Sequence, residues 1–372
     1  MKGLISFSFN WRIIALIALE LGCIVCLPQR SRREVTTYTV DVKVFTDIEM
    51  FNGWVKMVNE TALEKNNDTL KVLTQSKLKE YISLSFQQAS SRFSTLRNSV
   101  NPFMVKLQLV DVSFDYNLLG TSLTIDANES LYKFRDWLSS SKESNGLFDH
   151  AMLLTSRKLT SMQILGGDIQ GRAFIGRLCY TDGTSSSIIE DNGGFQSSFT
   201  MAHEIAHSLG AKHDSEENTG CSDNSFNTMS GSAPALGAVF TQWYFSSCSA
   251  NTIKTYIDNI PNVADIRQNC LTATWPPLPE FTNSLNSIPG QIFPPIEQCR
   301  LMYGRSSSVC YGGTFSQVNE ICTSMWCLDP QVAGGTTCKK HFAAEGSSCG
   351  DGQWCSLGKC TTDPRAPVLG GE

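Results

Sequence analysis

The chain has 372 residues, a formal net charge of −5 and 14 cysteines. This length accommodates one sizeable hydrophobic core and a small second module. The acidic balance gives no reason to expect nucleic acid as a partner, because phosphate backbones recruit clustered lysine and arginine. So many cysteines are unusual where thiols stay reduced, so an oxidising compartment is expected.

The N-terminal segment resembles a secretory signal peptide, because two basic residues precede an apolar run at residues 13–27. We place the signal peptide at residues 1–26 and a basic processing segment at 27–33, whose three arginines suit a protease of the furin type. An uncleaved signal anchor and a basic flank without a processing role are the alternatives. No later segment offers the ~18 apolar residues that a membrane span needs, so we predict a secreted, extracellular product with no stable membrane anchor.

Strands and helices alternate along the next part of the chain. Strand periodicity is found at residues 37–44, 103–114 and 150–155. Apolar residues at helical spacing predict a long amphipathic helix at 70–96 and another helix at 130–141. Residues 181–194 are rich in Gly, Ser and Asp and are expected to form a loop. This order of elements predicts an α/β sheet with helices packed against it.

Residues 200–214 contain three of the five histidines in the chain. On a helix, His203 and His207 share one face, because positions i and i+4 are neighbours. Two imidazoles on one face can hold a zinc ion, and Gly210 lets the chain leave the helix in a left-handed turn that brings His213 back as the third ligand. The fourth position stays open to water and substrate, which indicates a catalytic zinc site.

Glu204 lies beside the two helical histidines and is not placed to be a ligand. It can instead take a proton from a zinc-bound water, as the general base of a hydrolase. Met229 follows the third histidine by 16 residues, as a methionine turn beneath the zinc requires. A bare His-Glu-x-x-His motif also occurs by chance on ordinary amphipathic helices, but the added glycine, histidine and methionine argue against chance.

The extended motif resembles that of the metzincin metallopeptidases. Asp214, directly after the third histidine, resembles the reprolysin (adamalysin) branch, which includes snake-venom metalloproteinases, ADAM and ADAMTS enzymes. Residues 171–179 resemble the strand and cysteine upstream of the zinc helix in that branch. The resemblance implies a metzincin catalytic domain at 34–271, built from a twisted mixed sheet, long helices, the zinc helix and the Met-turn. It also implies that residues 172–175 form the sheet edge to which substrate adds as a further strand.

The composition changes after the catalytic domain. Residues 272–297 are rich in proline, which favours a stiff linker without internal hydrogen bonds, either solvated or packed along the catalytic domain. Residues 298–360 read as a disulfide-stapled module that lacks a sufficient core of its own. Its eight cysteines are Cys299, Cys310, Cys322, Cys327, Cys338, Cys349, Cys355 and Cys360. A zinc-binding module is the alternative, although His341 is the only histidine there. Residues 361–372 form a C-terminal tail.

Parts of the module, including residues 346–360, closely resemble the disintegrin-like/cysteine-rich module of ADAMTS enzymes. The resemblance also implies two disulfides in the catalytic domain, Cys179 with Cys270 and Cys221 with Cys248. The connectivity of the other eight cysteines stays open. No Arg-Gly-Asp sequence is present, so the name of the module is no evidence of integrin binding.

A calcium site is implied by the resemblance alone. Asp41 and Asp149 match the two acidic positions of the family, and Cys270 could give its carbonyl oxygen, since calcium prefers hard oxygen ligands. Ala273 stands where the family tends to place an asparagine, so the shell is incomplete. The alternative is that both aspartates are ordinary charges at strand ends.

Three Asn-x-Ser/Thr sequences begin at Asn59, Asn67 and Asn128. Each is a glycosylation acceptor if the chain is secreted, since the sugar is added along that route. All three lie in the expected catalytic domain, on segments that we expect to be exposed. Any of them could also go unused.

Together these features predict a secreted, zinc-dependent metalloendopeptidase that hydrolyses extracellular proteins, such as matrix or fibrinogen-like substrates, by Glu-assisted attack of a zinc-bound water. A toxin with such substrates is a special case of this prediction. The alternative is a secreted binding effector that acts mainly through the cysteine-rich module. Decay of the zinc motif would have favoured that alternative, and the motif is intact.

Overall fold

The computed structural model describes residues 35–61, 67–97, 102–141, 146–162, 167–216, 220–231, 240–260, 266–272, 274–312, 315, 317–332 and 337–367. The predicted signal peptide and processing segment lie outside these residues. Within them, no helix has both the length and the apolar character that crossing a membrane requires.

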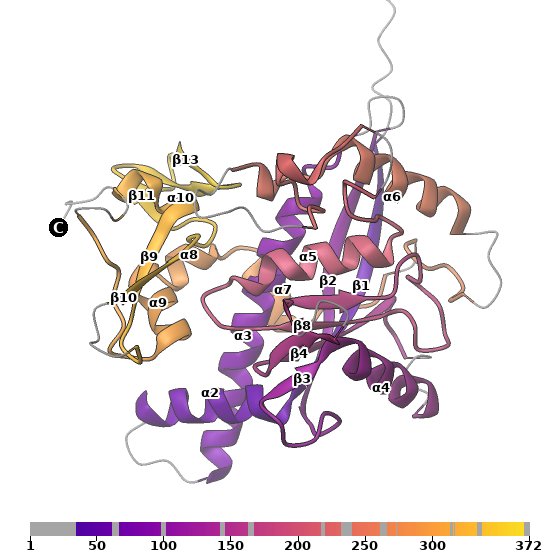
Figure 1. Ribbon diagram of the computed structural model, residues 1–372, viewed down its shortest axis with the longest axis horizontal. Helices are drawn as coiled ribbons and strands as arrows, with labels where there is room; N and C mark the ends of the chain where they lie inside the picture. Colours follow the sequence, from indigo (N-terminus) through magenta and orange to yellow (C-terminus); the bar gives the residue numbers. More distant parts are fainter. Residues whose placement is uncertain are drawn as a thin grey trace, which may run out of the picture. The chain divides into compact units, whose positions relative to one another are not determined.

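A five-stranded mixed sheet forms the centre of the catalytic domain (Figure 1). Its order is β2 (Phe103–Tyr116), β1 (Thr36–Asp47), β4 (His150–Thr155), β8 (Ser186–Glu190) and β7 (Gly171–Ala173). The first four strands run parallel, and the edge strand β7 pairs antiparallel with β8. The prediction of a mixed α/β sheet is therefore confirmed, and so is the placing of Arg172 on a sheet edge.

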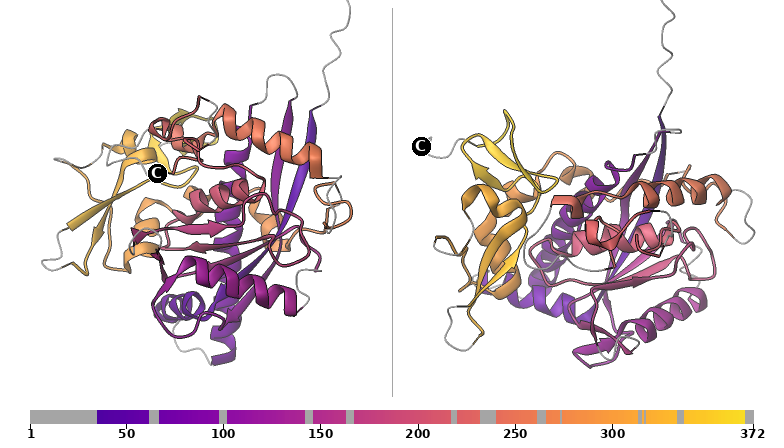
Figure 2. Two further views of the ribbon diagram at one scale, coloured as in Figure 1. Left: turned by 45° about the vertical axis from the view of Figure 1, so that its right-hand side comes forward. Right: turned by 45° about the horizontal axis from the view of Figure 1, so that its top comes forward.

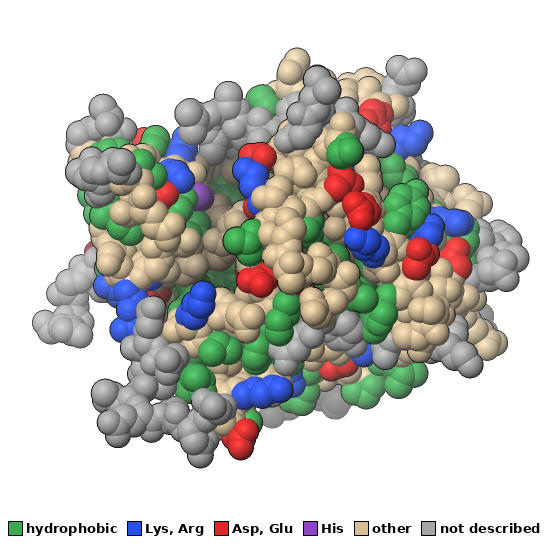
Figure 3. Space-filling view, turned by 60° about the horizontal axis from the view of Figure 1, so that its bottom comes forward, with side chains coloured by type: hydrophobic (Ala, Val, Ile, Leu, Met, Phe, Trp, Pro, Cys, Tyr) green, Lys and Arg blue, Asp and Glu red, His purple; other side chains and the backbone are tan. Residues whose placement is uncertain are grey.

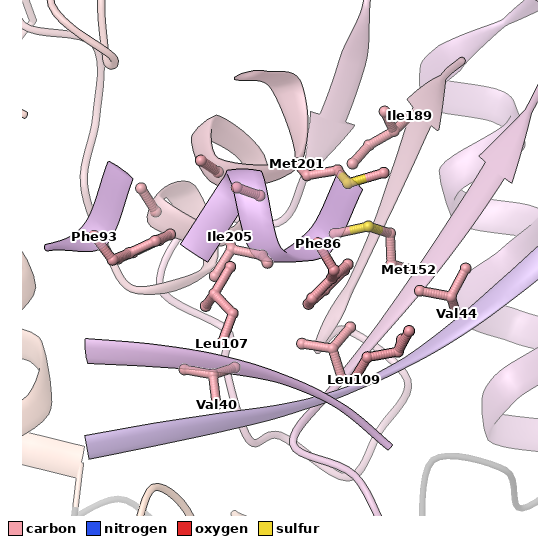
Figure 4. Close-up of a cluster of buried hydrophobic side chains, with 14 of the residues drawn as sticks. Val40, Val44, Phe86, Phe93, Leu107, Leu109, Met152, Ile189, Met201 and Ile205 are labelled. Carbon is pink, nitrogen blue, oxygen red and sulfur yellow. The ribbon is translucent and has the colours of Figure 1, made fainter. Parts of the chain in front are cut away.

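Helices cover both faces of this sheet (Figure 2). They are α2 (Ile48–Thr61), α3 (Asn67–Phe93), α4 (Ala127–Ser140) and α5 (Ser197–Ser208). Successive residues of β1 point to opposite faces, so Val44 joins the core under α3 and α5 whereas Phe45 joins the core under α4. Figure 4 shows Ile205 and Met201 of α5 in the first of these cores, together with Phe86 and Leu109. A small second sheet contains β3 (Thr124–Asp126), β5 (Lys158–Ser161) and β6 (Gly167–Asp168).

The predicted loop at residues 181–194 is wrong, because β8 occupies its middle and lies inside the sheet. Its serines are buried, and their hydroxyl groups have partners. Ser186 donates to the Gly183 carbonyl at 2.8 Å, and the Ser187 hydroxyl lies 2.9 Å from Nε2 of buried His150. A polar strand can be buried when its hydroxyl groups are satisfied in this way, and composition alone does not reveal it.

Two helix boundaries also differ from prediction. The helix predicted at 130–141 begins at Ala127, because the Asp126 side chain accepts the Glu129 backbone N–H at 2.9 Å and caps the first turn. The helix predicted at 70–96 ends at Phe93. Beyond it, the Thr95 hydroxyl and backbone N–H both donate to the Arg92 carbonyl, which closes the last turn.

The proline-rich segment is not a linker without internal hydrogen bonds. It contains α7 (Pro279–Ser284) and α8 (Pro289–Ile292), each with proline at the start, where the fixed φ of proline suits a helix. The segment also packs on the catalytic domain, since Phe281 is buried and the Leu278 N–H donates to the Leu109 carbonyl at 2.8 Å. The cysteine-rich module therefore follows a docked connection.

The cysteine-rich module consists of short elements joined by disulfides. These are α9 (Pro295–Tyr303), α10 (Ile321–Ser324), the hairpin of β9 (Met325–Asp329) and β10 (Thr337–His341), and a sheet of β11 (Ser348–Gly350), β12 (Gln353–Ser356) and β13 (Lys359–Thr362). The bonds join Cys299 to Cys327, Cys310 to Cys338, Cys322 to Cys355 and Cys349 to Cys360. All eight cysteines are thus paired, which leaves no thiolate for the alternative of a zinc module.

Leu109 tests the core that supports the sheet, because its side chain is 0% exposed between β1, α3 and α5. We expect Leu109→Ala to lower the free energy of unfolding by about 2–5 kcal/mol, since it removes buried methyl groups and leaves a cavity. The matched control is Leu123→Ala, whose side chain is 66% exposed and whose loss should cost under about 0.5 kcal/mol. Guanidinium chloride unfolding followed by tryptophan fluorescence measures both, and equal midpoints would contradict this account of the core.

Candidate active site

Helix α5 and the turn after it bring three imidazole rings together. His203, His207 and His213 each offer a ring nitrogen, and these three atoms lie within 4.8 Å of one another. The centroids of the rings are 4.6–5.3 Å apart. The structure therefore unites the three residues predicted to be zinc ligands.

Hydrogen bonds fix the tautomer of the two helical histidines. Nδ1 of His203 lies 2.7 Å from the Thr228 carbonyl, and Nδ1 of His207 lies 2.7 Å from the Ala211 carbonyl. A carbonyl can only accept, so each Nδ1 must carry the proton, and each Nε2 keeps its lone pair for a metal. Burial lowers the pKa of His203 to about 4 and lowers that of His207 as well, which keeps both rings neutral.

His213 has a different partner. Its Nδ1 lies 3.2 Å from a carboxylate oxygen of Glu216, which would orient this ring as the carbonyls orient the other two. Sequence reasoning missed Glu216, although its position three residues after a predicted ligand was a signal. Sequence reasoning also missed Thr228 and Ala211, because a backbone carbonyl leaves no trace in residue type.

Gly210 makes the turn that returns His213 to the site. Its φ is +91°, in the left-handed region, and a Cβ there would lie 3.3 Å from the Tyr256 side chain. Its N–H donates to the His207 carbonyl at 2.8 Å, which ends the helix directly after the second histidine.

Asp214 and Met229 anchor the backbone that follows the third histidine. Both side chains are 0% exposed, and the Asp214 N–H donates to the Met229 carbonyl at 2.9 Å. The Asp214 carboxylate accepts hydrogen bonds from the hydroxyls of Ser246 and Ser249, at 2.5 and 3.0 Å. Ser246 caps helix α6 (Ser247–Asn259), so Asp214 joins the turn after the zinc helix to another helix of the domain.

Glu204 faces the histidine cluster with a carboxylate that is only partly satisfied. The residue is 4% exposed, and its Oε2 accepts no hydrogen bond from any residue in the described ranges. Burial raises its pKa to about 8, whereas Arg172 acts to lower it. A buried carboxylate oxygen that has no partner among the described residues, beside three imidazoles of which His203 and His207 are held neutral by burial, fits a zinc ion and its water, so the donor set is the one such a site needs.

The edge strand β7 passes unusually close to this carboxylate. A Cβ on Gly171 would lie 2.6 Å from Thr200 Cγ2 and 2.8 Å from Glu204 Oε1. Only glycine allows this approach, so the residue sets the distance between the edge strand and Glu204. Sequence reasoning noted the segment by resemblance and missed the steric reason for its first glycine.

A cleft of about 950 Å³ contains the three histidines and Glu204. The catalytic domain gives one side of it, from β7 and α5, and the cysteine-rich module gives Tyr303, Lys339, His341 and Phe342 on the other side. Figure 3 shows the surface hollowed between the module, at the left, and the rest of the molecule. The active-site cleft is therefore built by both parts of the chain.

The residues predicted to bind calcium meet at the start of β4. The Asp41 N–H donates to Asp149 Oδ2 at 3.1 Å, and the Asp149 side chain lies beside the Cys179–Cys270 disulfide. Both oxygens of Asp41 already accept hydrogen bonds, from Gln108 Nε2 at 2.7 Å and from the Trp275 N–H at 2.9 Å. Ala273 lies outside the described residues. The second disulfide of the domain joins Cys221 to Cys248.

Of the three glycosylation sequences, only Asn128 has a described side chain. It lies in the first turn of α4, and its Oδ1 accepts a hydrogen bond from Arg172 Nε at 2.8 Å. The side chains of Asn59 and Asn67 lie outside the described residues. Asn128 therefore stands beside the edge strand of the cleft.

Gly171→Val tests the close approach of the edge strand. We expect activity to fall at least tenfold, because the new side chain must displace β7 or the Glu204 carboxylate, and misplacement by about 1 Å is this costly. Zinc content should stay unchanged, since the histidines keep their partners. Gly53→Val is the matched control for adding this side chain, because no atom lies within 4 Å of a Cβ at that glycine. Equal peptide cleavage by the two variants would contradict the steric argument.

Comparison with known proteins identifies the two parts of the chain. Residues 70–272 match the Reprolysin (M12B) family of zinc metalloproteases, and residues 289–361 match the ADAMTS cysteine-rich domain 2. Rat A disintegrin and metalloproteinase with thrombospondin motifs 1 is 29% identical over 298 residues, which are 76% of this chain and 28% of that protein. Mouse A disintegrin and metalloproteinase with thrombospondin motifs 18 is 30% identical over 288 residues, which are 75% and 21% of the two chains.

The chain thus matches only 28% and 21% of the length of these two relatives. Among solved structures, metalloproteinase-II from Bacteroides fragilis has a TM-score of 0.30 and 20% sequence identity, and the likeness covers 53% of this chain and 47% of that one. A TM-score this low does not bear on the fold. The reprolysin match at residues 70–272, by contrast, spans more than half of the 372 residues. The chain therefore belongs to the reprolysin (M12B) family of zinc metalloproteases, and its second part is an ADAMTS-type cysteine-rich domain.

Proposed function

We propose that this chain is a secreted metalloendopeptidase that hydrolyses extracellular proteins, with matrix or fibrinogen-like proteins as the substrate class. In this proposal His203, His207 and His213 hold the zinc ion, and Glu204 is the general base. The observation that carries it is Oε2 of Glu204, which accepts no hydrogen bond from a described residue, beside three imidazoles, two of which have Nδ1 bound to a carbonyl. The family membership supports the zinc and the protein substrate.

The residues of the chain divide the reaction between them. A bound zinc ion would supply a Lewis acid that polarises the scissile carbonyl and makes water more acidic. Glu204 takes the proton from the attacking water at its free Oε2 and later delivers it to the leaving nitrogen. Strand β7, hydrogen-bonded on one side to β8, can align the substrate backbone on its other side. Met229 and Asp214 hold the site in place and take no part in the proton transfers.

Secretion belongs to the proposal. It is supported by the signal-like N-terminal sequence and by the six disulfides among the described residues, which suit an oxidising compartment. Glycosylation of Asn59, Asn67 and Asn128 depends on the same route. The cleft favours a protease over the alternative of a binding effector, because the cysteine-rich module shares the cavity with the histidines.

Calcium at Asp41 and Asp149 stays a prediction. Oδ1 of Asp149 supports it, because this oxygen is buried and accepts no hydrogen bond from a described residue. The hydrogen bonds that both oxygens of Asp41 already accept oppose it, because an ion would have to compete with these donors. Burial raises the pKa of Asp149 to about 7, so without an ion the folded protein keeps this carboxyl group protonated below about pH 7.

Glu204→Ala tests the mechanism. We expect kcat to fall by about 10²–10⁴, because a positioned general base contributes that much, while zinc stays bound at one equivalent. Cleavage of fibrinogen, gelatin and casein by the secreted protein, with and without a zinc chelator, gives the rates, and elemental analysis gives the zinc content. Glu320→Ala, at an exposed position on the module, is the control. Retained chelator-sensitive cleavage by Glu204→Ala would refute this role.

Asp149→Asn tests the protonation state of the Asp149 carboxyl group. The folded protein binds a proton that the unfolded chain releases above pH 3.8, so stability should fall as the pH rises from there to about 7. We therefore expect Asp149→Asn to stabilise the zinc-loaded protein at pH 8 by roughly 2 kcal/mol in the absence of calcium, and to have little effect at pH 4.

Thermal unfolding with millimolar calcium separates the two accounts of this site. If calcium binds Asp149, the ion should raise the melting temperature of the parent protein at pH 8. The melting temperature of the Asp149→Asn variant should stay unchanged. If calcium changes neither protein, the calcium prediction fails, and the raised pKa of Asp149 alone explains the dependence of stability on pH.

A further inference from the structure

The proposed reaction does not use the most deeply buried cation of the described residues. Arg92, in the last turn of α3, is 0% exposed. None of its three guanidinium nitrogens donates a hydrogen bond to any residue in the described part of the chain. A buried charge is expensive unless other groups compensate it, so the surroundings of Arg92 must supply that compensation.

Three aromatic rings surround the guanidinium. Its carbon lies 5.4 Å from the ring centroid of Phe199, 5.4 Å from that of Trp243 and 5.7 Å from that of Phe342. Aromatic faces attract a cation at this distance, and more strongly when water is excluded. Phe199 and Trp243 belong to the catalytic domain and Phe342 to the cysteine-rich module, so the cation lies between the two parts of the chain.

The module also places a buried carboxyl group near Arg92, that of Glu345, whose pKa is raised to about 7 by burial although Arg92 acts to lower it. The Glu345 carboxylate interacts electrostatically with the guanidinium, and both its oxygens accept the Leu357 N–H, at 2.9 and 3.0 Å. The Glu345 N–H donates to Oε1 of Gln88 at 3.0 Å, one helical turn before Arg92 on α3. Burial lowers the pKa of Arg92 to about 10, and Glu345 acts in the opposite direction, so the guanidinium stays charged at neutral pH.

The fit around the cation is close on the module side. The Trp243 and Phe342 rings pack edge to face, with centroids 5.3 Å apart. A Cβ on Gly358 would lie 2.5 Å from Trp243 Cε3, so a larger residue there would push the module away. Gln196 holds the backbone of Phe342, donating to its carbonyl at 2.9 Å and accepting its N–H at 3.4 Å.

Two of the rings around Arg92 are also walls of the active-site cleft. Phe199 and Phe342 both line the cavity that contains the histidines, and the Phe199 ring lies 6.1 Å from that of His203. Arg92 lies behind this wall and does not line the cavity. A change at Arg92 would therefore reach the cleft through these two rings, without removing a group that faces substrate.

We propose that Arg92 is a positioning residue that docks the cysteine-rich module through its cation, held by Phe199, Trp243, Phe342 and Glu345, and thereby sets the wall of the cleft that long protein substrates contact. The docking does not depend on the reaction. The effect on cleavage rests on the proposed protease function.

Arg92→Met is the main test, because methionine keeps an apolar, unbranched side chain and removes the charge. We expect hydrogen exchange of the amides at 342–345 and 353–357 to speed up roughly tenfold, since attraction to the rings and to Glu345 is lost. We also expect kcat/KM for casein to fall about tenfold through KM, while a short fluorogenic peptide is cleaved within about twofold of the parent rate. Zinc affinity should not change.

Two further variants make the result decisive. Arg97→Met, at an exposed position in the turn after the same helix, is the matched control and should change none of these measurements. Glu345→Gln approaches the contact from the module and should speed up the same amides, so it tests the docking even if Arg92→Met fails to fold. The double variant should lose less protection from hydrogen exchange than the two single variants lose in sum. The reason is that each single change leaves a buried charged group without its partner.

The outcomes separate this proposal from the proposed function. Unchanged exchange in both Arg92→Met and Glu345→Gln overturns the docking role, whatever the activity. Faster exchange with an unchanged ratio of casein to peptide cleavage overturns the link to the cleft. If the parent protein cleaves neither substrate, the protease function fails, and the exchange data still decide the role of Arg92.

Discussion

The candidate active site depends on keeping the two imidazoles of helix α5 neutral and oriented inside the protein. A histidine can bind a metal only through an unprotonated nitrogen, and burial ensures that state for His203 and His207. Orientation comes from the backbone, because the Thr228 and Ala211 carbonyls occupy the Nδ1 side of each ring. The turn at Gly210 and the Met-turn are therefore needed for their carbonyl oxygens as much as for their shape.

The same constraint explains why residues far from any chemistry are buried around the site. The carbonyl of Thr228 is in place only if the Met-turn is, and the Met229 carbonyl is bound by the Asp214 N–H. Asp214 is in turn bound by two serines at the start of α6. A chain of hydrogen bonds thus joins His203 to the segment that carries His213 through elements that are distant in sequence, which favours an arrangement of the rings that exists before any metal binds.

The sequence predicted the parts of this site that residue type encodes. Spacing on a helix was enough to unite His203, His207 and Glu204, because helical geometry is local. It was not enough for β8, whose serines read as a loop and are buried by hydrogen bonds to His150 and the Gly183 carbonyl. Nor could it reveal Gly171 or Arg92, since their roles depend on atoms brought close only by the fold.

The buried cluster of the cysteine-rich module consists mostly of disulfide-bonded cysteines, so disulfides hold the module together and a larger neighbour can orient it. A flexible tether would let the module occupy many positions. A cleft wall whose position varies in this way would select poorly among substrates. The docked proline-rich segment and the contacts around Phe342 remove that freedom. A buried cation suits this purpose, because its desolvation is compensated only when the aromatic rings and the carboxyl group are all in place. A partly docked module would therefore gain little free energy from the contact.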